Sequence, residues 1–130
     1  MKITNLQLLQ INDALTYLSD SNTEAWYQVG KNLRKIKTPI VEFRASHQDI
    51  VENYAEKDKN GQIQFINESN TEINFGKNGE KATELWNNLM NEEIDIDFHK
   101  INYKKIGDAS LDALRVEPLL DIIITENGEK

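Results

Sequence analysis

A stripe of mainly apolar residues, spaced alternately by three and four positions, constrains the fold of this chain more than any other feature. Such heptad spacing places side chains along one side of an α-helix. Because the stripe keeps its phase across Pro39, we predict one long helix over residues 23–56. A kink is expected at Thr38 and Pro39, since proline removes a hydrogen-bond donor and crowds the preceding turn. Two helices that meet at Pro39 are the alternative. The stripe consists of Trp26, Val29, Leu33, Ile36, Ile40, Phe43, His47, Ile50 and Tyr54.

The length of this helix leads to a second prediction. At about 1.5 Å per residue it spans about 50 Å, more than the expected width of a 130-residue globule. Part of it is therefore expected to project or to pack on a second copy. His47, a lone histidine on an apolar face, is interpreted as a core residue with a hydrogen-bond partner rather than as a pH sensor. The stripe members interpreted as core or as an oligomer interface are Trp26, Ile40, Phe43, His47, Ile50 and Tyr54.

The residues before the stripe predict another helix. Thr4 and Gln7 fit a capping box, in which each side chain binds the backbone of the other residue. Residues 21–24 offer a second capping box, for the start of the long helix. The apolar face of the first helix contains Leu8, Leu9, Ile11, Leu15 and Leu18.

Short strands and further helices are predicted after the long helix. Residues 62–67 and 71–75 read as two strands joined by the hairpin loop "NESN", and residues 79–93 as a helix that buries Trp86. Near the end, a short helix is expected after Asp108 or Ser110, and another is expected to begin at Pro118. The run of isoleucines at 122–124 equally suits a strand.

The expected fold is therefore α+β and mostly helical. A long central helix, kinked at Pro39, packs on an N-terminal helix, and a small antiparallel β-sheet completes the fold. We expect one domain over residues 1–124 and a frayed tail over residues 125–130.

The stretch "EEIDIDFHK" is the most chemically loaded part of the chain. Apolar Ile94, Ile96 and Phe98 alternate with acidic residues, which is typical of a half-buried strand whose carboxylates face solvent. Carboxylates two positions apart on a strand lie about 6.6 Å from each other, too far for neighbours to share one metal ion unaided. We therefore predict a solvated strand face and no metal site. The acidic row, as we call it, consists of Glu92, Glu93, Asp95 and Asp97.

Composition excludes several classes of function. Without cysteine, the chain has neither a disulfide framework nor a thiolate nucleophile. No signal peptide or membrane span is seen, so we expect a cytoplasmic protein. Residues 1–59 carry eight basic and eight acidic side chains, whereas residues 60–130 carry seven and fourteen. An acidic half argues against nucleic acid as a partner, although the long helix has a basic flank of Lys31, Arg34, Lys35, Lys37 and Arg44.

Several segments together resemble a known family. They are "NLRKI", "VENYAEKDKNGQI", "NEEIDIDFHKI" and the closing "SLDAL" and "EPLLDIII", which span most of residues 5–124. In this order they resemble a family of small proteins encoded by phages and prophages of Gram-positive bacteria. That family has no established activity. The resemblance implies a phage gene product that works inside a bacterial host, and it transfers no catalytic residue.

These observations lead to two hypotheses of function. In the first, the protein is a phage-encoded binding protein without enzymatic activity that inhibits a host defence protein, such as a CRISPR nuclease. The acidic row would then contact a basic surface of the target. In the second, it is an accessory protein of virion or tail assembly that self-associates through its long helix. No nucleophile–base pair or cofactor motif is visible, so we expect no enzyme, no cofactor and no membrane partner.

Overall fold

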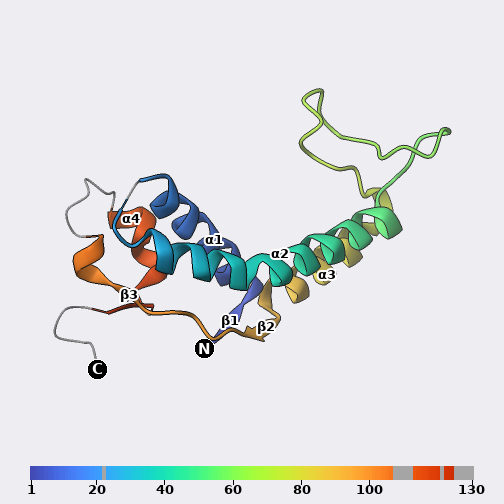
Figure 1. Ribbon diagram of the computed structural model, residues 1–130. Helices are drawn as coiled ribbons and strands as arrows, with labels where there is room; N and C mark the ends of the chain where they lie inside the picture. Colours follow the sequence, from blue (N-terminus) through green and yellow to red (C-terminus); the bar gives the residue numbers. More distant parts are fainter. Residues whose placement is uncertain (22, 107–112, 121, 125–130) are drawn as a thin grey trace. The chain divides into compact units, whose positions relative to one another are not determined.

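The computed structural model describes residues 1–21, 23–106, 113–120 and 122–124. Within these residues the fold is α+β and mostly helical, as predicted. Three 3-10 turns occur at Gly76–Asn78, Tyr103–Lys105 and Glu117–Leu119. The other elements, drawn in Figure 1, are β1 (Lys2–Thr4), α1 (Asn5–Asp20), α2 (Trp26–Tyr54), α3 (Gly79–Asn91), β2 (Glu93–Asp95), β3 (Ile101–Asn102), α4 (Ala113–Val116) and β4 (Ile123–Ile124).

The chain divides into two compact units. Unit 1 contains Met1–Ile40 and Glu93–Lys130, and unit 2 contains Val41–Glu92. Helix α2 contributes its first half to unit 1 and its second half to unit 2, and the boundary falls one residue after Pro39. The assignment of residues 1–124 to one domain stays a prediction. The expected tail, residues 125–130, lies outside the described residues.

The core of unit 1 forms around α1. The predicted capping box is confirmed: Gln7 N donates to Thr4 Oγ1 over 3.1 Å, and Thr4 N donates to Gln7 Oε1 over 2.9 Å. The apolar face that follows packs against α2, which confirms that the long helix lies on the N-terminal helix. Full burial of one such side chain stabilises the folded state by about 1.5–3 kcal/mol relative to leaving it exposed. Core members from the two helices include Leu8, Ile11, Leu15, Leu18, Val29, Ile36 and Ile40.

The antiparallel sheet in unit 1 joins the start of the chain to the acidic row. β1 pairs with β2 so that Lys2 lies opposite Asp95 and Thr4 opposite Glu93. The predicted alternation is confirmed, because Ile96 is buried while the carboxylates beside it are exposed. β1 itself was not predicted. β3 and β4 form a second, parallel pair, so the isoleucine run ends as a strand rather than a helix.

Unit 2 is built on the second half of α2 and on α3, which runs back along it (Figure 1). The ring of Trp86 on α3 contacts Phe43 and His47 of α2, with centroids 5.8 and 4.6 Å apart. Asn78 Nδ2 donates to the carbonyl of Tyr54 over 3.2 Å and fixes the start of α3 to the end of α2.

The predicted hairpin in unit 2 is shorter and more irregular than expected. Between the two predicted strands one isolated bridge forms, from Phe65 to Ile73, and another bridge joins Ile63 to Lys57, which follows α2. The reason is the turn chemistry: Asn67 Oδ1 accepts bonds from Thr71 N and Glu72 N, at 3.0 and 3.1 Å, and so occupies donors that a regular ladder would need.

The long helix is continuous across Pro39, so the alternative of two helices is wrong within this structure. The kink stays a prediction. The helix begins at Trp26 rather than residue 23, because Thr23 forms a turn in which its carbonyl accepts Trp26 N at 3.3 Å. The expected capping box at residues 21–24 is also wrong, since Ser21 Oγ donates instead to the Tyr17 carbonyl over 2.7 Å.

Two further expectations are only partly visible. The residues at which the short helix was expected to begin, after Asp108 or Ser110, lie outside the described ranges, and α4 is the helix described after them. Pro118 lies in the first turn of a 3-10 turn rather than of a longer helix. None of the helices in the described ranges is both long and apolar enough to cross a membrane.

Gly30 lies inside α2, where nothing in the structure requires a glycine. A Cβ added there would meet only the guanidinium of Arg34, at 3.4 Å, which is the end of a flexible, exposed side chain. We expect Gly30→Ala to raise the free energy of unfolding by about 0.5–1 kcal/mol, because alanine loses less backbone entropy in a helix. Urea denaturation followed by circular dichroism measures the change. A loss of stability would show that Arg34 cannot move aside.

Candidate functional site

The acidic row is exposed, but two of its four residues form ion pairs within the chain. Glu92 follows the last residue of α3 in unit 2, and the other three residues belong to unit 1. The amino group of Met1 donates to Asp95 Oδ1 over 2.9 Å and to the Ile96 carbonyl over 3.1 Å. This hydrogen bond, together with the positive charge of the amino group, lowers the pKa of Asp95. Asp97 lies 3.9 Å from Lys35 Nζ.

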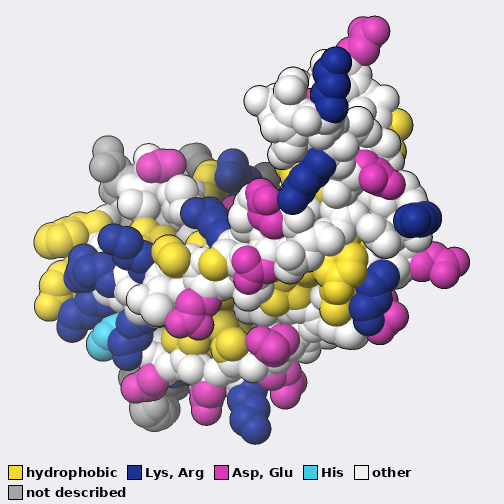
Figure 2. Space-filling model, turned by 90° about the vertical axis from the view of Figure 1, so that its right-hand side faces the viewer, with side chains coloured by type: hydrophobic (Ala, Val, Ile, Leu, Met, Phe, Trp, Pro, Cys, Tyr) yellow, Lys and Arg dark blue, Asp and Glu magenta, His cyan; other side chains and the backbone are white. Residues whose placement is uncertain are grey.

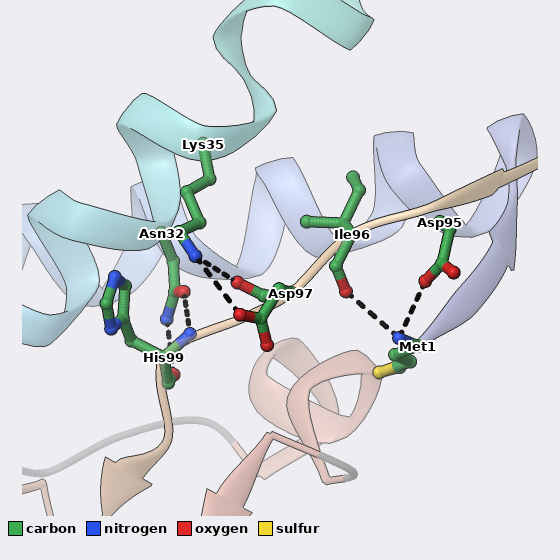
Figure 3. A network of polar contacts seen from close by, with 7 residues as sticks. All are labelled: Met1, Asn32, Lys35, Asp95, Ile96, Asp97 and His99. Atoms are coloured by element: carbon green, nitrogen blue, oxygen red, sulfur yellow. Dashed lines mark hydrogen bonds and ion pairs between the residues drawn. The ribbon is translucent and has the colours of Figure 1, made fainter.

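A buried amide fixes the segment after β2 to α2. Asn32 is fully buried on the inner side of α2, and its side chain forms two hydrogen bonds with the backbone of His99 (Figure 3). Asn32 Nδ2 donates to the His99 carbonyl over 2.9 Å, and His99 N donates to Asn32 Oδ1 over 2.7 Å. One turn further along α2, Lys35 Nζ donates to the Asp97 carbonyl. These hydrogen bonds therefore fix the segment that carries the end of the acidic row to α2.

His99 lies half-buried beside these contacts. Burial lowers the pKa of His99, and the positive charges of Lys35 and Lys31 lower it further, while Asp97 opposes the shift. The two lysines belong to the basic flank that the sequence indicated on the long helix. They lie close enough to the imidazole to disfavour its protonation.

The first turns of α2 also present aromatic rings to solvent. Trp26 is 69% exposed and Tyr27 is 49% exposed, and their rings form an edge-to-face pair with centroids 5.8 Å apart. Lys31 Nζ lies 4.5 Å from the centroid of the Tyr27 ring, within cation–π range. Arg34 extends back over Gly30, one turn away. Figure 2 shows Lys and Arg side chains gathered beside hydrophobic side chains at the left of the view.

We refer to Trp26, Tyr27, Lys31 and Arg34 as the aromatic–basic face. Its spacing follows from the helix: positions 27, 31 and 34 are separated by four and three residues, so their side chains emerge on one side. The sequence indicated the basic residues, but Trp26 was expected in the core or at an interface because it continues the phase of the stripe. Trp26 is nevertheless exposed, although Ala25 and Val29 on either side of it are buried in the core shared with α1.

The other stripe residues that were expected in the core or at an oligomer interface are buried or half-buried within the two units. Ile40 belongs to the core of unit 1, and Phe43 is buried in unit 2. Ile50 and Tyr54 are half-buried in unit 2. His47 is half-buried too, and within the described residues it contacts the Trp86 ring rather than the hydrogen-bond partner that was expected. Self-association through these residues stays a prediction.

Neither a metal centre nor a relative points to an activity. In the ranges 1–21, 23–106, 113–120 and 122–124, no three histidine, aspartate or glutamate side chains are placed to hold a metal ion together. Comparisons of the chain with protein-family models, curated proteins and solved structures find no match. The resemblance to phage proteins therefore stays a prediction.

Replacing Asn32 tests the structural role of the buried amide. In Asn32→Ala the N–H and carbonyl of His99 lose their partners in a half-buried place, which costs about 1–3 kcal/mol for each group left unsatisfied. We expect the free energy of unfolding to fall by about 2–4 kcal/mol, as measured by urea denaturation. Asn53→Ala, an exposed position on the same helix, is the matched control and should change stability by less than about 0.5 kcal/mol.

His99 provides a test of the charge arrangement. Its pKa is lowered from the usual value of 6.5, so the unfolded chain takes up a proton before the folded chain does. Its contribution to stability is therefore complete above about pH 6.5 and is lost as the pH falls from there towards the lower folded pKa. Urea denaturation at several pH values between 7.5 and 5 should show a larger loss for the wild type than for His99→Gln. Equal losses would contradict the assignment.

Proposed function

We propose that this protein is a binding protein without catalytic activity, and that it docks on a partner protein through the aromatic–basic face. The observation that favours this proposal is the exposure of Trp26 and Tyr27 side by side at the start of α2, flanked by two cations. Tryptophan, tyrosine and arginine are the residue types most enriched where binding energy concentrates in protein interfaces. Exposed rings of this size would bury a large apolar area on contact.

The chemistry of the face defines its partner. The Trp26 and Tyr27 rings suit an apolar pocket, and the guanidinium of Arg34 suits a carboxylate at the rim of that pocket, which it can bind through two parallel hydrogen bonds. Nucleic acid also pairs aromatic rings with cations, but the net charge of −7 on this chain repels phosphates. We therefore infer a protein partner with an apolar patch bordered by acidic side chains.

The biological setting of the proposal rests on the resemblance to phage and prophage proteins. In that setting the partner is a host or phage protein in the bacterial cytoplasm, and inhibition of a host defence protein is the outcome we propose for binding. The acidic row is a weaker candidate for the contact than it was from sequence alone. Asp95 and Asp97 already engage cations of the same chain, which leaves Glu92 and Glu93 as its members without an ion pair among the described residues.

Affinity capture with paired variants tests the proposal. The bait is the chain with a tag after Lys130, applied to lysate from phage-infected cells of a Gram-positive bacterium, and bound proteins are identified by mass spectrometry. We expect a partner that wild type retains and that Trp26→Ala with Arg34→Ala loses. With that partner purified, the double variant should bind at least about 30-fold more weakly by calorimetry, which corresponds to about 2 kcal/mol.

Two further baits make the result decisive. Val41→Ala shortens another exposed apolar residue of α2 outside the face and should retain the partner. Glu92→Ser with Glu93→Ser removes the unpaired half of the acidic row and should also retain it. If only the glutamate variant lost the partner, the binding surface would be the acidic row and not the aromatic–basic face. Retention by all baits would exclude both surfaces.

A further inference from the structure

Unit 2 contains a half-open cavity. Its volume is about 340 Å³, which lies in the range of small-molecule sites. All of its lining residues belong to unit 2, on α2, α3 and the irregular hairpin between them. They are His47, Ile50, Thr71, Ile73, Phe75, Ala82, Thr83 and Trp86.

Aromatic rings form much of the cavity wall. The Trp86 indole and the His47 imidazole lie 4.6 Å apart with their planes inclined by 57°, and Phe75 lines the cavity as well. The Phe43 ring also packs against the Trp86 ring, with the two centroids 5.8 Å apart. Rings held in fixed orientations favour a flat guest, because such a guest can stack on one ring and meet the edge of another.

Two polar groups at the wall have no partner within the described part of the chain. The ring nitrogens of His47 and the hydroxyl of Thr83 form no hydrogen bond there. Thr71, by contrast, already accepts a bond from Asn67 Nδ2 over 2.6 Å. A site that is mostly apolar and has one or two free polar groups fixes the orientation of a ligand through those groups.

The negative charge of unit 2 disfavours anionic ligands. Residues 41–92 carry five basic and ten acidic side chains, so an anion approaching the cavity is repelled. A neutral molecule pays no such cost. It also loses less hydration than an ion on entering an apolar site.

We propose that this cavity binds a neutral aromatic molecule of two or three rings, with a hydrogen-bonding atom directed at His47 or Thr83. This inference does not depend on the proposed function, because the aromatic–basic face lies in unit 1. It adds a small-molecule site to a chain whose surface we interpret as a protein-binding one.

A pair of fluorescent probes with the same skeleton tests both the site and the class of ligand. N-Phenyl-1-naphthylamine is neutral, and 8-anilino-1-naphthalenesulfonate differs from it by one sulfonate. In a Trp26→Phe background, Trp86 is the sole tryptophan, and its emission is transferred to a probe bound nearby. We expect saturable transfer to the neutral probe with a Kd between about 1 and 100 µM, and binding of the anion at least about 10-fold weaker.

Matched variants locate the bound probe. Thr83→Phe puts a ring into the wall of the cavity and should weaken the neutral probe at least 10-fold, whereas Asn88→Phe, the same change at an exposed α3 position outside the lining, should leave it unchanged. His47→Ala removes one aromatic wall and should also weaken binding, so the test remains if Thr83→Phe does not fold by circular dichroism. Equal effects of the two phenylalanine variants, or no saturable transfer, would overturn the site. Tighter binding of the anion would overturn the ligand class.

Discussion

The buried side chain of Asn32 joins the two stretches of chain that make up unit 1. Its two bonds to His99 connect residues that are 67 positions apart, and closing a loop of that length costs about 4 kcal/mol of chain entropy before any contact is made. The pairing of β1 with β2 and the shared apolar core offset the same cost. The place of the acidic strand, the half-burial of His99 and the positions of Lys31 and Lys35 around it all depend on this closure.

Some charged side chains of the molecule stabilise its fold, whereas others remain available for contact with another molecule. Where the acidic row touches α2 and the start of the chain, carboxylates and carbonyls accept bonds from cations and hold the strand in place. Near the start of α2, Lys31 and Arg34 form no ion pair with a carboxylate of the described residues, and Lys31 lies over the exposed Tyr27 ring. A surface whose cations are engaged with aromatic rings rather than with acids keeps its capacity for ion pairing with another molecule.

Local patterns in the sequence predicted the elements that short-range physics determines. The capping box of α1, the continuous α2 and the alternation in β2 depend on residues within a few positions of each other, so the spacing alone was sufficient. Features that need long-range contact were missed. β1 is three residues long and exists because β2 lies beside it, and Asn32 reads as an ordinary polar residue until its distant partner is known.

At two sites the sequence pattern predicted the face of an element but not the contacts that its residues make. Trp26 fits the phase of the stripe, yet a heptad pattern states only which side of a helix a residue faces and not whether another segment covers that residue. The acidic row was correctly placed on the exposed face of a strand, but the sequence could not show that Met1 and Lys35 lie near enough to engage it. The cavity of unit 2 could not be foreseen at all, since it is lined by three segments that meet only in the folded chain.

Helix α2 is shared between the two units, and this has a consequence for how the protein opens. If the packing in unit 2 is lost, the end of α2 loses its support and its backbone amides exchange with solvent from Tyr54 backwards. This fraying would reach the core of unit 1 at Ile40, the residue after Pro39 and the last residue of α2 that belongs to unit 1. Buried packing at Ile40 opposes further opening there, so we expect the second half of α2 to exchange before the first half.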